Sequence, residues 1–357
     1  MSYSILDDPG ILKQYDREDM LAHIREMPSL CQLAWHLAGD FDIPAEYVDI
    51  DKVIILGMGG SAIGGDLVSN LLLNEASLPI SVCRGYQLPA YVDDKTLLIA
   101  SSYSGNTEET LSAFRQSLNT KAKKIVITTG GRLKILAEEY NLPLFHFDYS
   151  AQPRAALPFS MLPILCFLQK LKLTGDKSEE VYDATTAMRE MGNIIAEKTP
   201  LTQNPAKQLA QFIYGKLPVV YGGGIVSEVA HRWKTQVNEN SKAWCFHEVF
   251  PELNHNAVVG YQFPENLKSN IVVVLLNSKL LPERIKLRYE VTRRIMEKEG
   301  IKYRLIDGTG NSRLAQIMSL VLFGDYTSYY LAILYRADPS PVKAIDYLKQ
   351  RLAKEQY

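Results

Sequence analysis

Two short, hydroxyl-rich turns hold the residues of this sequence that could bind a charged ligand. The first covers residues 57–66 (GMGGSAIGGD) and the second covers residues 101–107 (SSYSGNT), each directly after an apolar run. Each turn leads into a predicted helix, whose N-terminus presents unpaired N–H groups and a positive dipole end. Two such turns at one edge of a parallel sheet predict a single anionic-ligand pocket. The residues that could line it are Gly59, Gly60, Ser61, Ser102, Ser104 and Thr107.

The composition of these turns favours a phosphate monoester over a nucleotide. Residues 57–66 lack both the GxGxxG pattern with its ribose-binding acid and the GxxxxGK[ST] pattern of a P-loop. Glycines also serve tight turns, and Ser and Thr also cap helices, so capping alone is the competing explanation. Hydroxyls beside free N–H groups suit a phosphate monoester. We therefore favour phosphate binding over capping alone.

Three further residues could stabilise charge or move protons. Arg154 stands at the start of a predicted helix, where it could point at a ligand held by the turns. Glu239 stands at the end of a predicted helix, where the dipole opposes a carboxylate, and a catalytic base would explain its presence. His255 lies in ELNHN (252–256) and has the most polar neighbourhood of the six histidines.

Alternating strands and helices must position these residues. The pattern of strand, turn and helix predicts two α/β/α sandwiches with parallel sheets, related as an internal repeat of roughly 165 residues. Asn106 and Glu109 read as a capping box at one helix start. The predicted strands are 52–57, 96–100, 124–128, 143–148, 217–221, 271–276 and 302–306. The predicted helices include 61–73, 107–118, 132–140, 153–172, 178–197, 282–299 and 311–336, with another ending at 237.

The predicted elements divide the chain into five parts. The second half has lost the hydroxyl cluster, so one phosphate site per chain is expected, and residues 241–262 are expected to form a long polar turn. The parts are a helical segment (1–45), a first domain with the phosphate site (46–172), a helical linker (173–205), a second domain (206–336) and a C-terminal segment (337–357).

The composition fits a soluble protein of two domains, at 357 residues with 46% hydrophobic content. A net charge of −1 argues against a nucleic-acid partner. The four cysteines form no CxxC pair, and no ligand-spaced cluster predicts a metal. The sequence shows no signal-peptide pattern and no apolar run of the roughly 18 residues that a membrane span needs, so a cytoplasmic location is expected.

With these residues in view, the chain resembles the bifunctional phosphoglucose/phosphomannose isomerase family, which is built from two sugar isomerase (SIS) domains. The resemblance covers nearly the whole chain in order. The segments NENSK and ELNHN make it specific, whereas the two turns alone would indicate only a SIS domain. The segments that carry it are 57–66, 101–110, 238–242, 252–256 and 338–342, followed by Ile345, Leu348 and Lys349.

The resemblance implies an aldose–ketose isomerase that interconverts glucose 6-phosphate and mannose 6-phosphate with fructose 6-phosphate. It implies metal-independent proton transfer through a cis-enediolate and no cofactor. Glu239 would be the base that shuttles the proton, and Arg154 would stabilise charge at C1 and C2. His255 would assist ring opening from the partner subunit of a homodimer. The six residues of the two turns would hold the sugar phosphate.

The resemblance also implies that residues 337–357 return to the active site, where Lys349 would complete the ring-opening pair. Lys343 lies nearby and is an alternative to Lys349. Ala257 follows His255 and Asn256 at a position where an acidic residue is expected. The sequence therefore leaves open both the catalytic lysine and the preference between glucose 6-phosphate and mannose 6-phosphate.

Two other functions compete with this one. An amino-sugar phosphate isomerase would share the phosphate site, but an enzyme that takes ammonia from glutamine needs an N-terminal cysteine, and Cys31 is the earliest here. A SIS-domain regulatory protein would bind a sugar phosphate without catalysis. Residues 1–45 are too short and too acidic for a DNA-binding helix-turn-helix.

Overall fold

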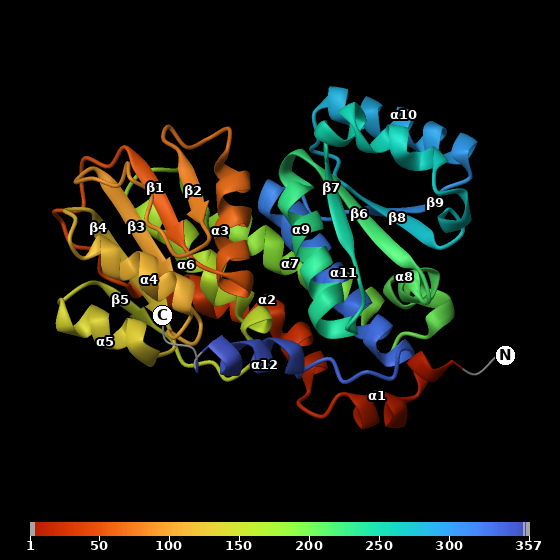
Figure 1. Cartoon of the computed structure of the whole chain (residues 1–357), viewed down its shortest axis with the longest axis horizontal. Coiled ribbons are helices and arrows are strands. Elements are labelled where there is room, and N and C mark those ends of the chain that lie inside the picture. The colour runs from red at the N-terminus through yellow and green to blue at the C-terminus, as the bar shows by residue number, and fades with distance from the viewer. Residues whose placement is uncertain (1–3, 353, 355–357) are drawn as a thin grey trace.

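The structure is a computed structural model that describes residues 4–352 and residue 354. Two parallel β-sheets form two lobes that lie side by side (Figure 1). Sheet A has the strand order β2-β1-β3-β4-β5 and sheet B has the order β7-β6-β8-β9. The strands are β1 (Lys52–Leu56), β2 (Ile80–Cys83), β3 (Thr96–Ser101), β4 (Lys123–Thr128), β5 (Leu144–His146), β6 (Leu217–Gly223), β7 (Phe246–Phe250), β8 (Ile271–Asn277) and β9 (Lys302–Asp307).

The helices cover both faces of each sheet. The α-helices of the first half are α1 (Pro9–Tyr15), α2 (Met20–Asp40), α3 (Gly59–Leu72), α4 (Glu108–Ser117), α5 (Gly131–Glu139), α6 (Leu157–Lys170) and α7 (Ser178–Ile195). Those of the second half are α8 (Pro205–Ile213), α9 (Ser227–Ser241), α10 (Glu283–Glu299), α11 (Arg313–Leu334) and α12 (Lys343–Leu352). Short 3-10 helices include η2 (Pro153–Ala156), η4 (Gly224–Val226), η5 (Glu252–His255) and η6 (Ala257–Gln262).

The alternation of side chains along β1 explains the three layers of the first lobe. Val53 and Ile55 belong to the core shared with α3 and α6, whereas Ile54 and Leu56 belong to a separate core shared with α4 and α5. A strand that is buried on both faces is a continuous apolar run, which is the pattern that β1 shows.

The two sheets repeat one topology, as the sequence predicted. The orders β2-β1-β3-β4 and β7-β6-β8-β9 correspond strand for strand, and β5 has no counterpart in sheet B. In both halves the helix after the first strand, α3 or α9, packs against the helix that closes the unit, α6 or α11. The prediction of two parallel α/β units related as an internal repeat is therefore confirmed.

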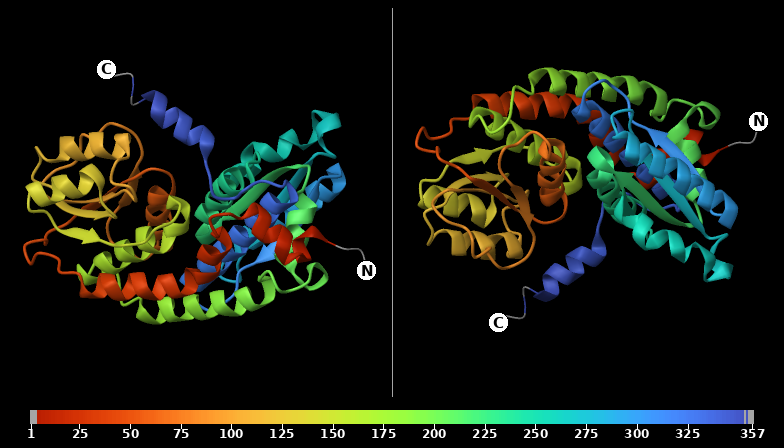
Figure 2. Two further views of the ribbon diagram at one scale, coloured as in Figure 1. Left: turned by 90° about the horizontal axis from the view of Figure 1, so that it is seen from below. Right: turned by 90° about the horizontal axis from the view of Figure 1, so that it is seen from above.

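Helices α2 and α7 lie along one side of both lobes (Figure 2), and both pack against α11. By length and composition, α11 is the one helix of the described residues that could cross a membrane, which the sequence analysis had not anticipated. However, 94% of its most apolar window is buried inside the protein. Its apolar surface is therefore explained by its central place in the core.

The structure corrects three local predictions. Strands β2 and β7 were not predicted, because β2 is a four-residue edge strand and β7 is half-exposed and carries His247 and Glu248. Strand β7, with η5 and η6, replaces most of the long polar turn predicted over 241–262. The capping box is also wrong, since Thr107 is the N-cap of α4 and the Asn106 side chain instead accepts a hydrogen bond from the Arg132 backbone N–H, at 3.0 Å.

Candidate active site

The two hydroxyl-rich turns lie beside each other at the carboxyl edge of sheet A. Strands β1 and β3 are neighbours whose last paired residues are Leu56 and Ala100, so both turns leave the sheet at the same level. The Tyr103 backbone N–H donates to Ser61 Oγ at 3.1 Å, which ties the second turn to the first. The fold therefore brings the predicted phosphate-binding residues of both turns into one place.

The second turn has little freedom of shape. Ser102 and Thr107 exchange a hydroxyl hydrogen bond of 3.0 Å, and the Asn106 N–H donates to Ser104 Oγ at 3.2 Å. Gly105 has a φ of +64°, and a Cβ there would lie 1.8 Å from the Gly130 carbonyl oxygen. Only glycine fits this position, so the hydroxyls are held in a preorganised loop.

The N-cap residues of α3 and α4, which lie beside these turns, do not occupy the first backbone N–H groups of their helices. Among the described residues, neither Met58 at the start of α3 nor Thr107 at the start of α4 forms a side-chain cap. The Thr107 hydroxyl is therefore not used as an ordinary helix cap, which was the competing explanation for its presence. Helix α4 carries two acidic residues in its first turn and α3 carries none, so α3 supplies more of the positive potential.

Arg154 lies at the junction of the two halves and is 2% exposed. Its Nε donates to Asn240 Oδ1 at 2.5 Å, and one terminal nitrogen lies 3.4 Å from Glu239 Oε2. The other terminal nitrogen donates to the carbonyl oxygens of Pro339 and Ser340 at 2.5 and 2.8 Å. These contacts fix the plane of the guanidinium and leave its Glu239-facing nitrogen with a further N–H for a ligand.

The turn after β1 and the backbone of Arg154 are in direct contact. A Cβ on Gly60 would lie 3.0 Å from the Pro153 carbonyl oxygen and 3.2 Å from the Arg154 Cα, so any side chain here would press on the backbone of η2. The turn therefore lies beside the start of η2, from which Arg154 reaches Glu239. The sequence predicted each of these residues separately, and the fold places them side by side.

A buried network behind Arg154 holds it in place. Arg232 donates to the Arg154 carbonyl oxygen at 3.1 Å and to Asp325 at 2.8 Å, and both Arg232 and Asp325 are almost fully buried. Burial raises the pKa of Asp325, whereas the charge of Arg232 lowers it. Asn240 donates in turn to Ser328 at 2.9 Å. The sequence analysis missed these supporting residues, although Asn240 lies within NENSK.

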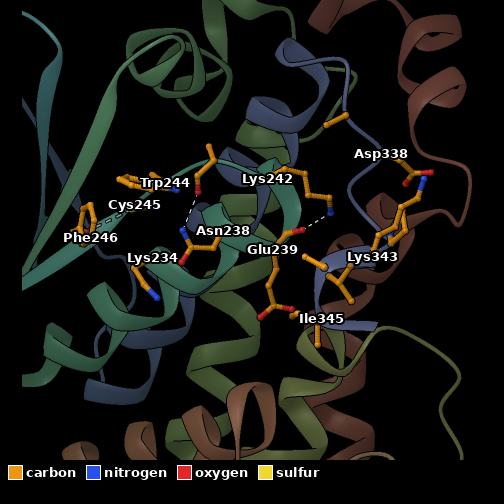
Figure 3. Close-up of a pocket in the computed structure, with 15 residues that line it drawn as sticks. Lys234, Asn238, Glu239, Lys242, Trp244, Cys245, Phe246, Asp338, Lys343 and Ile345 are labelled. Carbon is orange, nitrogen blue, oxygen red and sulfur yellow. Dashed lines mark hydrogen bonds between the residues drawn. The ribbon is translucent and has the colours of Figure 1, made fainter. Parts of the chain in front are cut away.

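Glu239 also borders an open cavity of about 970 Å³ on the side of the C-terminal segment (Figure 3). Lys242 and Lys343 line the same cavity, together with apolar side chains such as Trp244 and Ile345. None of the described residues of the two turns lines it. Glu239 therefore has Arg154 beside it and this cavity on another side.

Lys242 adds a positive charge near Arg154. Its Nζ donates to the Glu239 and Pro339 carbonyl oxygens, the second at 3.0 Å, although much of the side chain is exposed. Partial burial, and then the charge of Arg154, lower its pKa to about 8. Arg154 and Lys242 together hold the Pro339 carbonyl, so the C-terminal segment is attached at this site.

We expect the stability contribution of Lys242 to rise with pH. Its pKa is about 8 in the folded chain and near 10.5 in the unfolded chain, so between these values the unfolded chain binds more protons. The free energy of unfolding of the wild type should therefore increase relative to that of Lys242→Asn as the pH rises from 8 to 10. Asparagine tolerates the φ of +55° at this position. Urea unfolding at both pH values measures the difference, and a constant difference would contradict it.

His255 lies away from Glu239 within one chain. Strand β7 begins beside the cavity that Glu239 borders and ends at Phe250, which pairs with Gly223 at the carboxyl edge of sheet B. Its five residues span about 17 Å in extended form. His255 follows that far end and is exposed, and its side chain forms no hydrogen bond to another described residue.

Lys349 lies on the exposed helix α12, and its side chain forms no hydrogen bond or ion pair to another described residue. Lys343, the alternative, lines the cavity beside Glu239. Within one chain the fold thus brings the first turn to Arg154, Arg154 to Glu239, and Lys343 to the cavity that Glu239 borders. His255 lies beyond the far end of β7, and Lys349 is not among the described residues that line this cavity.

Comparison with known proteins places the chain in a family. It is 40% identical to a bifunctional phosphoglucose/phosphomannose isomerase of Caldicellulosiruptor bescii over 336 residues, which cover 94% of this chain and 99% of that one. The chain belongs to this isomerase family. The phosphoglucose/phosphomannose isomerase of Aquifex aeolicus is 36% identical and covers 88% of this chain and 94% of its own.

The second half of this chain also matches the model of a protein family. Residues 202–352 match the bacterial phospho-glucose isomerase C-terminal SIS domain. Among solved structures, the C-terminal domain of glucosamine-fructose-6-phosphate aminotransferase from Francisella tularensis superposes with a TM-score of 0.73. The superposition covers 90% of this chain and 98% of that one at 16% identity, so it shows a shared fold alone.

Proposed function

We propose that this chain interconverts glucose 6-phosphate and mannose 6-phosphate with fructose 6-phosphate. The observation that carries the proposal is the contact between Arg154 and Glu239 directly beside the phosphate-binding turns. A carboxylate next to a buried cation, within reach of a bound sugar phosphate, is the arrangement that proton transfer between adjacent carbons needs. Membership in the isomerase family supports the same reaction.

The chemistry assigns a role to each of these groups. The phosphate would be held at the turns, and its binding energy would orient the reacting end of the sugar. The Glu239 carboxylate would take the proton from C2 of the open-chain aldose, and the electron pair of that bond would form the enediolate. Arg154 would stabilise the charge on its oxygens. Glu239 would then return the proton to C1 while the hydroxyl proton of O2 passes to O1, which leaves a hydroxyl at C1 and the carbonyl at C2. Because C2 is planar in the enediolate, both epimeric aldoses reach the same intermediate.

We further propose that His255 acts in the site of a partner subunit of a homodimer. Within one chain it lies at the opposite edge of sheet B from Glu239, and it is exposed and unpaired among the described residues. An isologous interface would bring each η5 to the site of the other chain. The ring-opening partner would be Lys349, with Lys343 as the alternative that already borders the Glu239 cavity.

The cytoplasm is the location that we propose for this enzyme. All four cysteines are free, and three of them are buried. Free thiols without any disulfide fit a reducing compartment.

A coupled assay with both aldose phosphates tests the proposed reaction. We expect turnover of glucose 6-phosphate and of mannose 6-phosphate, undiminished in EDTA, because a carboxylate and an arginine suffice for the proton transfer. Activity that disappears in EDTA while the protein remains folded, and that returns with zinc, would overturn the metal-independent mechanism. Turnover of amino-sugar phosphates alone would overturn the choice of substrate.

We expect Ser104→Ala and Thr107→Val to weaken the binding of phosphorylated ligands much more than that of free sugars. Each removes a hydroxyl that could donate to a charged oxygen, a bond worth about 1.5–3 kcal/mol, or roughly 10- to 100-fold in affinity. Titration with 5-phosphoarabinonate, an enediolate mimic, measures the loss. Ser112→Ala, which removes a hydroxyl from the exposed side of α4, is the matched control. A lower melting temperature with unchanged affinity would mean that the hydroxyls only support the fold.

A further inference from the structure

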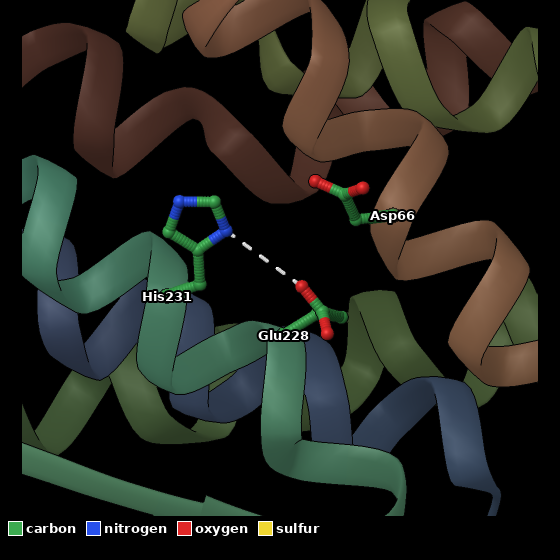
Figure 4. Close-up of side chains that lie close together, drawn as sticks. All are labelled: Asp66, Glu228 and His231. Carbon is green, nitrogen blue, oxygen red and sulfur yellow. Dashed lines mark ion pairs between the residues drawn. The ribbon is translucent and has the colours of Figure 1, made fainter. Parts of the chain in front are cut away.

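Three side chains that can bind a metal ion meet where the two lobes touch. Asp66 comes from α3, and Glu228 and His231 come from the first turns of α9 (Figure 4). Their ligand atoms all lie within 4.8 Å of one another, and each residue is partly buried. His231 Nδ1 is 3.7 Å from Glu228 Oε2. The cluster joins helices that are far apart in the sequence.

Asp66 accepts a hydrogen bond from Arg84, whereas the contact between Glu228 and His231 is not a closed hydrogen bond. The separation of 3.7 Å is longer than a hydrogen bond. Zinc binds nitrogen and carboxylate oxygen at about 2.0–2.2 Å, which puts the ligand atoms of a tetrahedral site about 3.3–3.6 Å apart. The three atoms, now within 4.8 Å of one another, would have to move closer to reach that spacing. Partial burial leaves room for a water molecule as the fourth ligand.

The charges around the cluster also favour a cation. Asp66 pairs with Arg84, whereas Glu228 has no ion-pair partner among the described residues except His231. When the His231 imidazole is neutral, the charges of Asp66, Glu228 and Arg84 sum to −1. The His231 ring stacks on His247 at 4.8 Å between centroids and 16° between planes, which restricts its orientation. One imidazole with two carboxylates is a ligand set that zinc accepts.

We propose that Asp66, Glu228 and His231 bind one zinc ion that fastens the two lobes together. The ion would join α3, whose N-terminus borders the phosphate-binding turns, to α9, whose last turn carries Glu239. His231 precedes Glu239 by eight residues, about 12 Å along the helix, so the ion takes no part in the reaction. It stabilises the relative placement of the two helices that form the active site.

Metal binding to the full-length protein tests this site. After treatment with EDTA and its removal, we expect calorimetric titration with Zn²⁺ to show one ion per chain and the melting temperature to rise by several degrees. His231→Gln should weaken Zn²⁺ at least about tenfold and remove most of the rise, since even the loss of an outer-shell partner costs that much. His36→Gln is the matched control, because His36 also lies near a carboxylate of its own helix, Asp40, but on the exposed face of α2.

Two further measurements keep the proposal falsifiable if His231→Gln does not fold. Glu228→Gln should show the same loss of Zn²⁺ affinity, and Co²⁺ bound to the wild type should give the visible absorption of a tetrahedral site. Equal Zn²⁺ affinity and equal melting shifts in the wild type and a folded Glu228→Gln variant would overturn the site, as would octahedral Co²⁺. All of these readouts are independent of turnover, so they stand or fall separately from the proposed reaction.

Discussion

Glu239→Gln is expected to lower kcat by about 10²- to 10⁴-fold while the affinity for sugar phosphates changes little. The amide has nearly the same shape as the carboxylate, and its oxygen can still accept the Arg154 hydrogen bond that is 3.4 Å long in the wild type. It has no basicity, so the loss falls on proton transfer rather than on binding. Coupled assays measure kcat, and calorimetry with 5-phosphoarabinonate measures affinity.

A second readout separates the loss of a base from a general disturbance of the site. In deuterated water the wild type should exchange the C2 proton of its substrate, and Glu239→Gln should not. Glu248→Gln makes the same chemical change on β7 and should leave both rate and exchange unchanged. Exchange at the wild-type rate in Glu239→Gln would remove Glu239 from the role of base.

Mixing two inactive variants is expected to restore activity if His255 acts in the partner's site. In a mixed dimer of Glu239→Gln and His255→Ala, one site carries both defects and the other carries neither. Random exchange of subunits makes half of the dimers mixed, so about a quarter of all sites should be intact. If His255 acts within its own chain, every site retains one defect and the mixture remains inactive.

The matched control for this experiment uses two residues that already meet within one chain. Arg154 and Glu239 are in contact, so a mixture of Arg154→Met and Glu239→Gln cannot form an intact site in either subunit. It should remain inactive under the same exchange conditions. Mass spectrometry verifies the exchange, and an inactive Glu239→Gln and His255→Ala mixture after verified exchange would rule out the shared site. The isomerase assignment would not depend on that result.

The sequence by itself determined the class of fold and the location of the two hydroxyl-rich turns. Apolar runs such as 53–56 alternate with amphipathic stretches. This pattern can be read within each segment, and it indicates which side chains of that segment are buried. Parallel connectivity then requires that the turns after β1 and β3 meet at one edge. The short edge strand β2 and the half-exposed β7 escaped prediction because their burial patterns are weak.

Only the tertiary structure decided which distant residues meet. Arg154 contacts Glu239, and its other terminal nitrogen donates to the Pro339 and Ser340 carbonyls. Both contacts depend on how the two lobes and the C-terminal segment pack. The cluster of Asp66 with His231 depends on the same packing, and no spacing in the sequence indicates it. Periodicity records whether a side chain is buried, but the identity of its partner is set by the docking of whole helices.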